Sequence, residues 1–318
     1  MSMTLTHTRV DDWSAYELAN QAMRLTVIPE LGGKILTLDD ARSGRSWLWR
    51  NPYLPLRTPE AGGVYIESFD SGGWDEVFPS VDPCAAGSVG GAWGDHAITD
   101  HGELWCRPWS VQACDGALKM FVDDPALPFR FERTLRLAPD EGPLTFDYTL
   151  VNQTEKPLPY IWATHPLIAI EPGMRIDVPP GVKATCTGGD GEGLPPLNQP
   201  FEWPHNGSHD LSCVPQRGQA GFAVKLFTEP MDHASVTLTP PDGSAALKLT
   251  MAAGAPHRVG MWLNYDGWSG AKTTHYFNAG IEPTTTPADR LDLSAADGAA
   301  AVLGPRGTVQ WALRVELA

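Results

Sequence analysis

The sequence predicts an all-β protein built from antiparallel strands, and three observations support this fold class. Apolar and polar residues alternate with a period of two in several short runs, and turn sequences rich in Gly, Pro and Asp separate these runs. No segment has the apolar periodicity of an amphipathic helix of three turns or more. The 32 glycines and 29 prolines also fit many turns and few long helices. Strands that follow one another without helices indicate an antiparallel sandwich or barrel.

The predicted strands follow this alternation along the chain. The runs 129–137 and 144–150 each have one apolar face, with Arg133 as the exception, and the turn sequence at 139–143 joins them as a hairpin. The other predicted strands are 23–28, 34–38, 235–239, 247–251 and 309–317. The stretches 188–200 and 202–209 are rich in Gly, Pro and polar residues, which predicts a long loop beside the functional face.

Composition limits the domain organisation and the class of partner. The chain has 318 residues, of which 42% are hydrophobic and 19% charged, an ordinary globular composition. No linker-like stretch divides it, so we predict one domain over 1–318. The formal charge of −15 and the pI of about 4.9 argue against nucleic acid and anionic membranes as partners. No run is long and apolar enough to span a bilayer.

The cysteines and the start of the chain indicate the compartment. The first residues lack the charged and apolar regions of a signal peptide. The cysteines are odd in number and never spaced as C-x-x-C, so we interpret them as reduced thiols of a cytoplasmic protein. They are Cys84, Cys106, Cys114, Cys186 and Cys213.

Three short polar segments, 100–105, 163–167 and 280–284, hold groups suited to proton transfer. His165 precedes Pro166, which restricts it to extended backbone geometry, and His101 lies before a glycine. Glu282 follows an apolar, glycine-containing run, and a carboxylate desolvated there would be a stronger base. The alternatives are a core histidine, a solvated loop histidine and an exposed glutamate. Because these residues are far apart in sequence, they can form one acid–base site only through folding.

A second group of residues suits sugar binding rather than proton transfer. Asp75 can hold hydroxyl groups and Trp74 can stack on a pyranose ring, although a turn packed by Trp74 is the alternative. Trp262 and Trp105 are further stacking candidates among 12 tryptophans, most of which are expected in the core.

A metal site is the competing interpretation of the histidines. His96, His101 and His165 could supply nitrogen ligands, but no spacing matches a zinc signature and no cysteine is suitably placed. We therefore expect no metal and no cofactor.

Five motifs, in this order, resemble those of the aldose 1-epimerase (galactose mutarotase-like) superfamily. The resemblance runs from about Met23 to the C-terminus, and the motifs are Gly32-Gly33-Lys34-Ile35, Gly73-Trp74-Asp75-Glu76-Val77-Phe78-Pro79, His101-Gly102 with Arg107-Pro108-Trp109, Thr164-His165-Pro166 and Ile281-Glu282-Pro283.

The resemblance implies a large antiparallel β-supersandwich with few short helices and a sugar-binding groove. It implies an isomerase that interconverts the α and β anomers of a monosaccharide, with Glu282 as base at the C1 hydroxyl. It also implies His165 as acid at the ring oxygen, assisted by His101. Galactose-specific members have an Asp-containing segment between the histidine and glutamate motifs. Its counterpart here, 221–225, contains Lys225 and no Asp, which argues against galactose as substrate.

Two other functions remain open from the sequence. A hydrolase or lyase on the same scaffold would need Glu282 paired with a second carboxylate, such as Asp75, Glu76 or Glu103. A non-catalytic sugar-binding protein would need neither His165 nor Glu282.

The predicted ligand is a neutral or singly charged monosaccharide. Lys34 and Arg107, if they point inward, would hold one carboxylate or phosphate, so hexose, hexose phosphate and uronic acid are all open.

Overall fold

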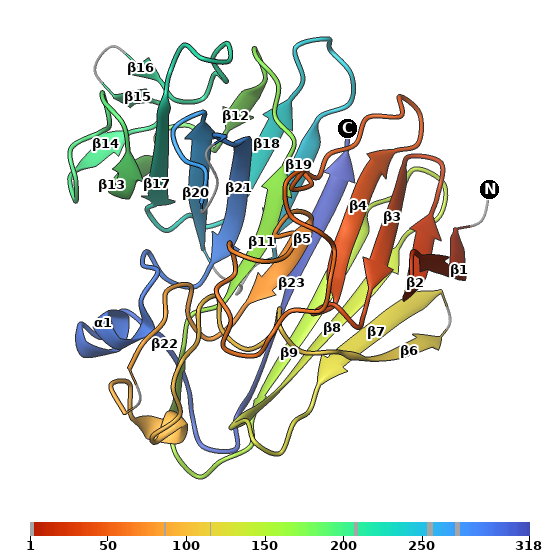
Figure 1. Cartoon of the computed structure of the whole chain (residues 1–318), viewed down its shortest axis with the longest axis vertical. Coiled ribbons are helices and arrows are strands. Elements are labelled where there is room, and N and C mark those ends of the chain that lie inside the picture. Colours follow the sequence, from red (N-terminus) through yellow and green to blue (C-terminus); the bar gives the residue numbers. More distant parts are fainter. Residues whose placement is uncertain (1–2, 86, 115, 207–208, 253–256, 271–273) are drawn as a thin grey trace.

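Two large antiparallel sheets packed face to face form the protein (Figure 1). The computed structural model describes residues 3–85, 87–114, 116–206, 209–252, 257–270 and 274–318. The larger sheet has 11 strands, in the spatial order β1 (Thr4–Val10), β2 (Trp13–Ala19), β3 (Met23–Ile28), β4 (Lys34–Asp40), β5 (Trp74–Val77), β11 (Ala163–Ile168), β21 (Phe277–Thr284), β20 (Arg258–Tyr265), β17 (Phe222–Thr228), β13 (Lys183–Asp190) and β14 (Pro200–Glu202).

The second large sheet has eight strands and lies behind β3 and β4 in Figure 1. Its order is β12 (Arg175–Asp177), β18 (Ser235–Thr239), β19 (Leu247–Met251), β23 (Thr308–Leu317), β9 (Leu144–Asn152), β8 (Phe129–Leu137), β7 (Ala117–Val122) and β6 (Ser110–Cys114). Two small sheets pair β10 (Leu158–Tyr160) with β22 (Ala301–Leu303) and β15 (His205–Asn206) with β16 (His209–Asp210). The helices of the described residues are a 3₁₀ turn, η1 (Gly91–Trp93), and α1 (Leu291–Ala296).

The all-β prediction is confirmed, and so are the hairpins read from the alternation. β8 pairs with β9 and β18 with β19 within a few residues of the predicted bounds. The long loop predicted beside the functional face is wrong in part. Residues 188–190 are the end of β13, which pairs with β17, and residues 200 and 202 belong to the edge strand β14, which pairs with β13. Residues 205–206 and 209 lie in the small sheet of β15 and β16. The Gly- and Pro-rich stretches still offer backbone groups for pairing. Residues 207–208 lie outside the described residues.

The core lies between the sheets and takes every second residue of the paired strands. Ile35 and Ile281 of the larger sheet and Phe131 and Phe146 of the smaller one are fully buried there. Such burial of large apolar side chains contributes about 1.5–3 kcal/mol each. The helices of the described residues are too short to reach across a membrane.

Arg133 is also in this core. Its guanidinium is fully buried, and Nη1 donates a hydrogen bond of 2.9 Å to Glu76 Oε1. The ring centroid of Trp109 lies 5.0 Å from the guanidinium carbon. Arg133, the charged residue that interrupts the apolar face of β8, therefore forms an ion pair with Glu76 in the core.

Candidate active site

Four central strands of the larger sheet, β11, β21, β20 and β17, direct a set of functional side chains away from the core. Glu282 lies opposite Gly260, Trp262 opposite Gly280, and Lys225 opposite Trp262. Because alternate residues of a strand share a face, Ile281 on the same strand points into the core while Glu282 points out.

These side chains face a cavity of about 480 Å³ on the outer surface of the sheet, which is a usual size for a small-molecule site. Loops between the strands complete its wall. The lining residues are Trp49, Val64, Tyr65, Ile66, Ser71, Val81, Asp82, Pro83, Asp100, His101, His165, Leu167, Lys225, Trp262, Trp268, Tyr276, Asn278, Glu282 and Asp289. The three predicted catalytic residues are thus brought together.

Glu282 is held at one oxygen and free at the other. Lys225 Nζ donates a hydrogen bond of 2.5 Å to Oε2, whereas Oε1 has no hydrogen-bond partner and lies 3.7 Å from His165 Nε2. The residue is only 1% exposed. A Cβ at Gly280 would lie 2.7 Å from Oε1, so a glycine is needed there for the carboxylate to occupy this position. Oε1 is therefore a buried acceptor available to a ligand in the cavity.

The charge state of two neighbours follows from their surroundings. Burial, and next the positive groups His101, Lys225 and Lys34, hold the pKa of His165 well below its usual value, so this imidazole is neutral near pH 7. Burial alone would lower the pKa of Lys225, but the carboxylates of Asp289 and Glu282 outweigh it and raise that pKa. Lys225 is therefore an ammonium ion, with Asp289 Oδ1 at 3.5 Å from its Nζ.

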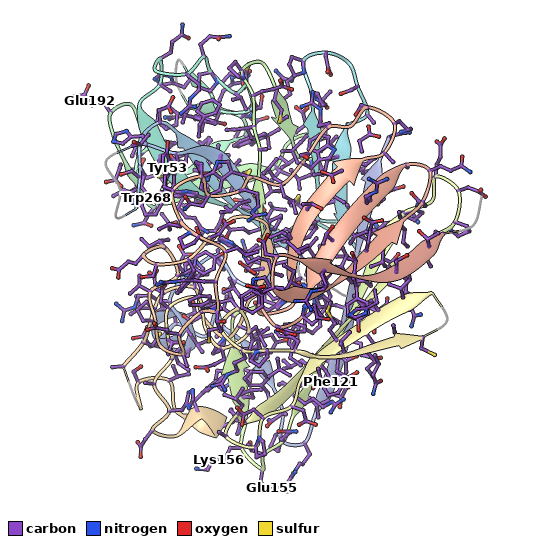
Figure 2. All side chains as sticks on the ribbon, turned by 45° about the vertical axis from the view of Figure 1, so that its right-hand side comes forward. Tyr53, Phe121, Glu155, Lys156, Glu192 and Trp268 are labelled. Atoms are coloured by element: carbon purple, nitrogen blue, oxygen red, sulfur yellow. The ribbon has the colours of Figure 1, made fainter. Side chains whose placement is uncertain are left out.

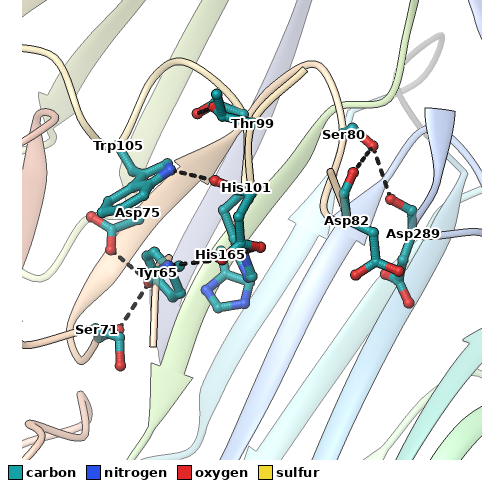
Figure 3. Close-up of polar contacts among 12 residues, drawn as sticks. Tyr65, Ser71, Asp75, Ser80, Asp82, Thr99, His101, Trp105, His165 and Asp289 are labelled. Atoms are coloured by element: carbon teal, nitrogen blue, oxygen red, sulfur yellow. Dashed lines mark hydrogen bonds and ion pairs between the residues drawn. The ribbon is translucent and has the colours of Figure 1, made fainter. Parts of the chain in front are cut away.

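His101 is oriented by Asp100 and by Tyr65, and Figure 3 shows Tyr65, His101 and His165 close together. Its Nδ1 lies 2.8 Å from Asp100 Oδ1. Burial raises the pKa of Asp100, but the hydrogen bond and charge of His101 outweigh this and lower it, so Asp100 accepts the Nδ1 hydrogen as a carboxylate. The Tyr65 ring stacks on the imidazole at 4.1 Å, and the His165 ring meets His101 edge-on at 5.3 Å.

Close packing fixes the backbone at His101. This residue has φ 55°, and Gly102 follows with φ 74°. A Cβ at Gly102 would lie 2.0 Å from the Phe78 carbonyl oxygen, and His101 N donates to the Val81 carbonyl at 2.6 Å. The H-G motif is thus explained by the turn that presents the imidazole.

The opposite side of the cavity carries two further carboxylates, Asp82 and Asp289, which lie near each other in Figure 3. Asp82 N donates to the Asp289 carbonyl at 2.8 Å, and Ser80 Oγ donates to the carbonyl oxygens of both residues, at 2.7 and 3.1 Å. Two segments more than 200 residues apart are joined in this way. Sequence analysis did not single out either aspartate, because neither lies in a recognisable motif.

Aromatic side chains form the remaining wall. Trp262 and Trp268 meet edge-on at 5.7 Å, and Tyr276 lies between Trp268 and Trp49. Tyr53, exposed in Figure 2 beside Trp268, stacks on Tyr276 at 5.9 Å. Of the predicted stacking residues, Trp262 alone lines the cavity.

Trp74 is a core residue, which corrects the prediction that it stacks on a sugar. It is fully buried, its ring stacks on Phe146 at 4.9 Å, and its Nε1 donates to Thr164 Oγ1. The reason is strand alternation: Trp74 and Glu76 point into the core, whereas Asp75 points to the opposite face. Trp105 is likewise buried and does not line the cavity; its Nε1 donates to the Asp100 carbonyl at 2.9 Å.

Asp75 and Lys34 lie behind the cavity wall rather than in it. Lys34 Nζ donates to Asp75 Oδ2 at 2.5 Å and to the Gly72 carbonyl at 2.8 Å. The Tyr65 hydroxyl lies 2.7 Å from the same carboxylate oxygen, and burial, then the charge of Asp75, raise the pKa of Tyr65 well above its usual value. The pair therefore supports Tyr65 instead of contacting a ligand, which corrects both substrate-binding predictions.

Arg107 is also outside the cavity. Its guanidinium donates to Glu103 Oε2 at 2.7 Å and to Asp124 Oδ2 at 2.6 Å. Arg107 and these two carboxylates do not line the cavity, so the prediction that Arg107 holds a substrate anion is wrong.

The described residues contain no cluster of three or more His, Cys, Asp or Glu side chains with the arrangement of a metal site. His96 is one of the three histidines considered as metal ligands. Its Nε2 lies 3.1 Å from Glu103 Oε1, and it does not line the cavity.

No protein-family model matches this sequence, and no curated protein sequence matches it. Solved structures do resemble it over nearly the whole chain. A galactose mutarotase-like protein from Clostridium acetobutylicum has a TM-score of 0.67 at 13% identity, covering 100% of this chain and 99% of that one. A galactose mutarotase related enzyme from Lactobacillus acidophilus has a TM-score of 0.63 at 15% identity, covering 96% and 97%. A galactose mutarotase-like protein from Lactobacillus casei has a TM-score of 0.62 at 15% identity, covering 96% and 100%.

Proposed function

We propose that this protein with a galactose mutarotase-like fold is a sugar 1-epimerase, which interconverts the α and β anomers of an aldose by general acid–base catalysis. The observation that carries the proposal is the free, buried Oε1 of Glu282 beside His165 and His101 in one cavity. The C1 hydroxyl and the ring oxygen are bonded to the same carbon, so a base and an acid a few ångströms apart can reach both.

In the proposed reaction, Glu282 Oε1 takes the proton of the C1 hydroxyl. The electron pair of that O–H bond forms the C1 carbonyl as the bond between C1 and the ring oxygen breaks, and the ring oxygen receives a proton. Rotation about the C1–C2 bond then presents the other face of the aldehyde. The reverse steps close the ring and return both protons, so the reaction needs no redox partner.

We divide the acid role between the two histidines differently from the sequence-based expectation. His165 is neutral near pH 7, so it acts as a hydrogen-bond donor to the ring oxygen. His101, whose Nδ1 is paired with the Asp100 carboxylate, supplies the proton. His101→Asn should then reduce kcat at least as much as His165→Asn.

Lys225 is proposed as a positioning residue for the base. Its hydrogen bond to Oε2 fixes the rotamer of Glu282 and leaves Oε1 as the oxygen that reacts. A role for Lys225 in binding a substrate anion is disfavoured, because its ammonium already has two carboxylate partners.

The alternative functions have less support. The three carboxylates named as partners for a hydrolase are engaged elsewhere: Asp75 by Lys34, Glu76 by Arg133 and Glu103 by Arg107. A protein that only binds sugar does not need imidazoles able to donate protons beside the carboxylate that accepts them, and His165 and His101 both line this cavity with Glu282.

The test is anomer exchange measured by NMR exchange spectroscopy on a panel of aldoses. The wild-type protein should accelerate exchange of at least one sugar, and the Glu282→Gln variant should not. If no sugar in a panel of neutral, amino, phosphorylated and carboxylated aldoses exchanges faster than in buffer, the proposed function is wrong.

A further inference from the structure

The cavity wall has an excess of negative charge that its own cation does not balance. Four carboxylates line it, and Lys225 is the sole lysine or arginine among its described lining residues. Asp100 is engaged by His101 and by the Tyr65 backbone amide, and Glu282 is engaged by Lys225. The remaining two carboxylates, Asp82 and Asp289, face the cavity. Asp289 Oδ1 lies 3.5 Å from the ammonium nitrogen of Lys225.

The backbone segments that carry the two aspartates are hydrogen-bonded to each other. Val81 N and Asp82 N both donate to the Asp289 carbonyl, at 3.0 and 2.8 Å, so the two segments run together at this point. Figure 3 shows both carboxylate groups directed the same way. Asp289 is the more enclosed of the two, and burial raises its pKa despite the nearby charge of Lys225. Asp82 lies at the exposed mouth of the cavity.

An independent observation indicates that a ligand with several hydrogen-bond donors belongs here. Glu282 Oε1 and Asn278 Oδ1 lie on residues that are 1% and 2% exposed, line the same cavity and have no hydrogen-bond partner. Buried acceptors without donors are rare in folded proteins because they lose hydration without compensation. The wall therefore offers acceptors and negative charge, and the ammonium group of Lys225 in this wall is already paired with two carboxylates.

We propose that the substrate is an amino sugar, whose ammonium group lies between Asp82 and Asp289 while its anomeric carbon lies at Glu282. This inference rests on the proposed function and specifies its substrate. A single ammonium group, Lys225 Nζ, contacts both Glu282 and Asp289, so the Asp82–Asp289 subsite is next to the base. The position that fits is the carbon adjacent to C1, as in a 2-amino-2-deoxyaldose.

The same wall disfavours two substrates that the sequence left open. A phosphate or a uronate carboxylate would meet uncompensated carboxylates, and each such contact is repulsive in a partly desolvated site. The basic residues predicted to hold such an anion, Lys34 and Arg107, are paired with carboxylates outside the cavity.

The experiment compares kcat/KM for anomer exchange of glucosamine, N-acetylglucosamine, glucose and glucose 6-phosphate with the full-length protein. It is done at about pH 6.5, where an amine of this kind carries its charge. We expect glucosamine to exceed glucose and N-acetylglucosamine by about tenfold or more, the range of one charged hydrogen bond, and glucose 6-phosphate to be the poorest.

Two variants and a matched control assign the preference to the subsite. Asp289→Asn should reduce the ratio of glucosamine to glucose activity by about tenfold, and Asp82→Asn by less, because Asp82 is more exposed. Asp297→Asn makes the same chemical change at an exposed residue outside the cavity and should leave the ratio unchanged. Thermal melts confirm that each variant is folded.

The outcomes separate this inference from the proposed function. If glucose or glucose 6-phosphate is preferred, or if the glucosamine preference survives both aspartate variants, the amino-sugar inference is overturned while the epimerase stands. If no sugar exchanges, NMR titration of glucosamine and glucose decides the inference alone. Glucosamine binding that is tighter than glucose binding and weakened by Asp289→Asn supports it; equal binding overturns it.

Discussion

Glu76 and Glu282 are both buried carboxylates paired with a cation, yet they lie on opposite faces of the same sheet and differ in one respect. Glu76 is fully satisfied: Arg133 and Tyr148 donate to Oε1 at 2.9 Å, and Trp162 donates to Oε2 at 3.0 Å. Glu282 has Lys225 at Oε2 and no hydrogen-bond partner at Oε1.

The difference distinguishes an ion pair that only supports the fold from one that leaves a carboxylate oxygen available to a ligand. Both glutamates are at most 1% exposed, so burial alone does not separate them. What separates them is that each Glu76 oxygen has a protein donor, whereas Glu282 keeps one oxygen free towards a cavity of about 480 Å³ that Glu76 does not line. Buried polar groups that stay unsatisfied are those for which a ligand is the expected partner.

The largest expected effect is on Glu282. Glu282→Gln should reduce kcat for anomer exchange by about 10²–10⁴-fold, because the amide keeps the shape and cannot accept the proton. The variant should stay folded, since Lys225 keeps Asp289 and faces the open cavity. NMR exchange rates and a thermal melt measure both effects. Exchange at the wild-type rate would remove Glu282 from the base role.

Glu76→Gln should have the reverse phenotype. Removing the partner of the fully buried Arg133 should lower the free energy of unfolding by about 3–5 kcal/mol, as measured by urea denaturation. The fraction that remains folded should retain kcat within a fewfold, because Glu76 on β5 points into the core and does not line the cavity. A loss of kcat as large as that of Glu282→Gln, in folded protein, would contradict the comparison.

The pH dependence of stability should report the buried neutral state of His165. Its pKa is lowered in the folded protein, so below about pH 6.5 the unfolded chain binds a proton that the folded protein does not. Stability is therefore lost as the pH falls, by at most about 1.4 kcal/mol per pH unit from this residue. His165→Gln should remove this component, which urea denaturation of both proteins near pH 7 and pH 5 would detect. Parallel slopes in the two proteins would contradict the neutral state.

Gly280→Ala should displace the reactive oxygen directly. The new Cβ would lie 2.7 Å from Glu282 Oε1, and a displaced catalytic group should reduce kcat by about tenfold or more. Gly188→Ala is the matched control, because a Cβ at Gly188 in β13 meets nothing within 4 Å. Steady-state kinetics of the two variants decide the matter; equal, wild-type kcat values would mean that the position of Oε1 is not critical.

The smallest effect is expected at Arg107. Because its guanidinium is engaged by Glu103 and Asp124 outside the cavity, Arg107→Ala should change KM for charged and neutral sugars by less than about twofold. A KM that rises for charged sugars alone would place this arginine in the site after all.

The sequence by itself determined the fold class and the identity of the central polar residues. Alternation with a period of two is a local property, so the hairpins at β8–β9 and β18–β19 could be predicted from the chain. Gly102 and Pro166 likewise fix local geometry beside His101 and His165. A carboxylate and two imidazoles that share a site were therefore predictable as candidates.

Only the tertiary structure decided which face each residue takes and which distant residue it meets. Strand order in the larger sheet puts β11 beside β21 and β17 beside β20, and this non-local pairing gives Glu282 its partner Lys225. Packing against the second sheet buries Trp74 on Phe146, and backbone hydrogen bonds between distant segments join Asp82 to Asp289. Alternation predicts that neighbouring residues of a strand face opposite sides of the sheet. Which side is buried depends on where the second sheet packs, and no local sequence pattern encodes that packing.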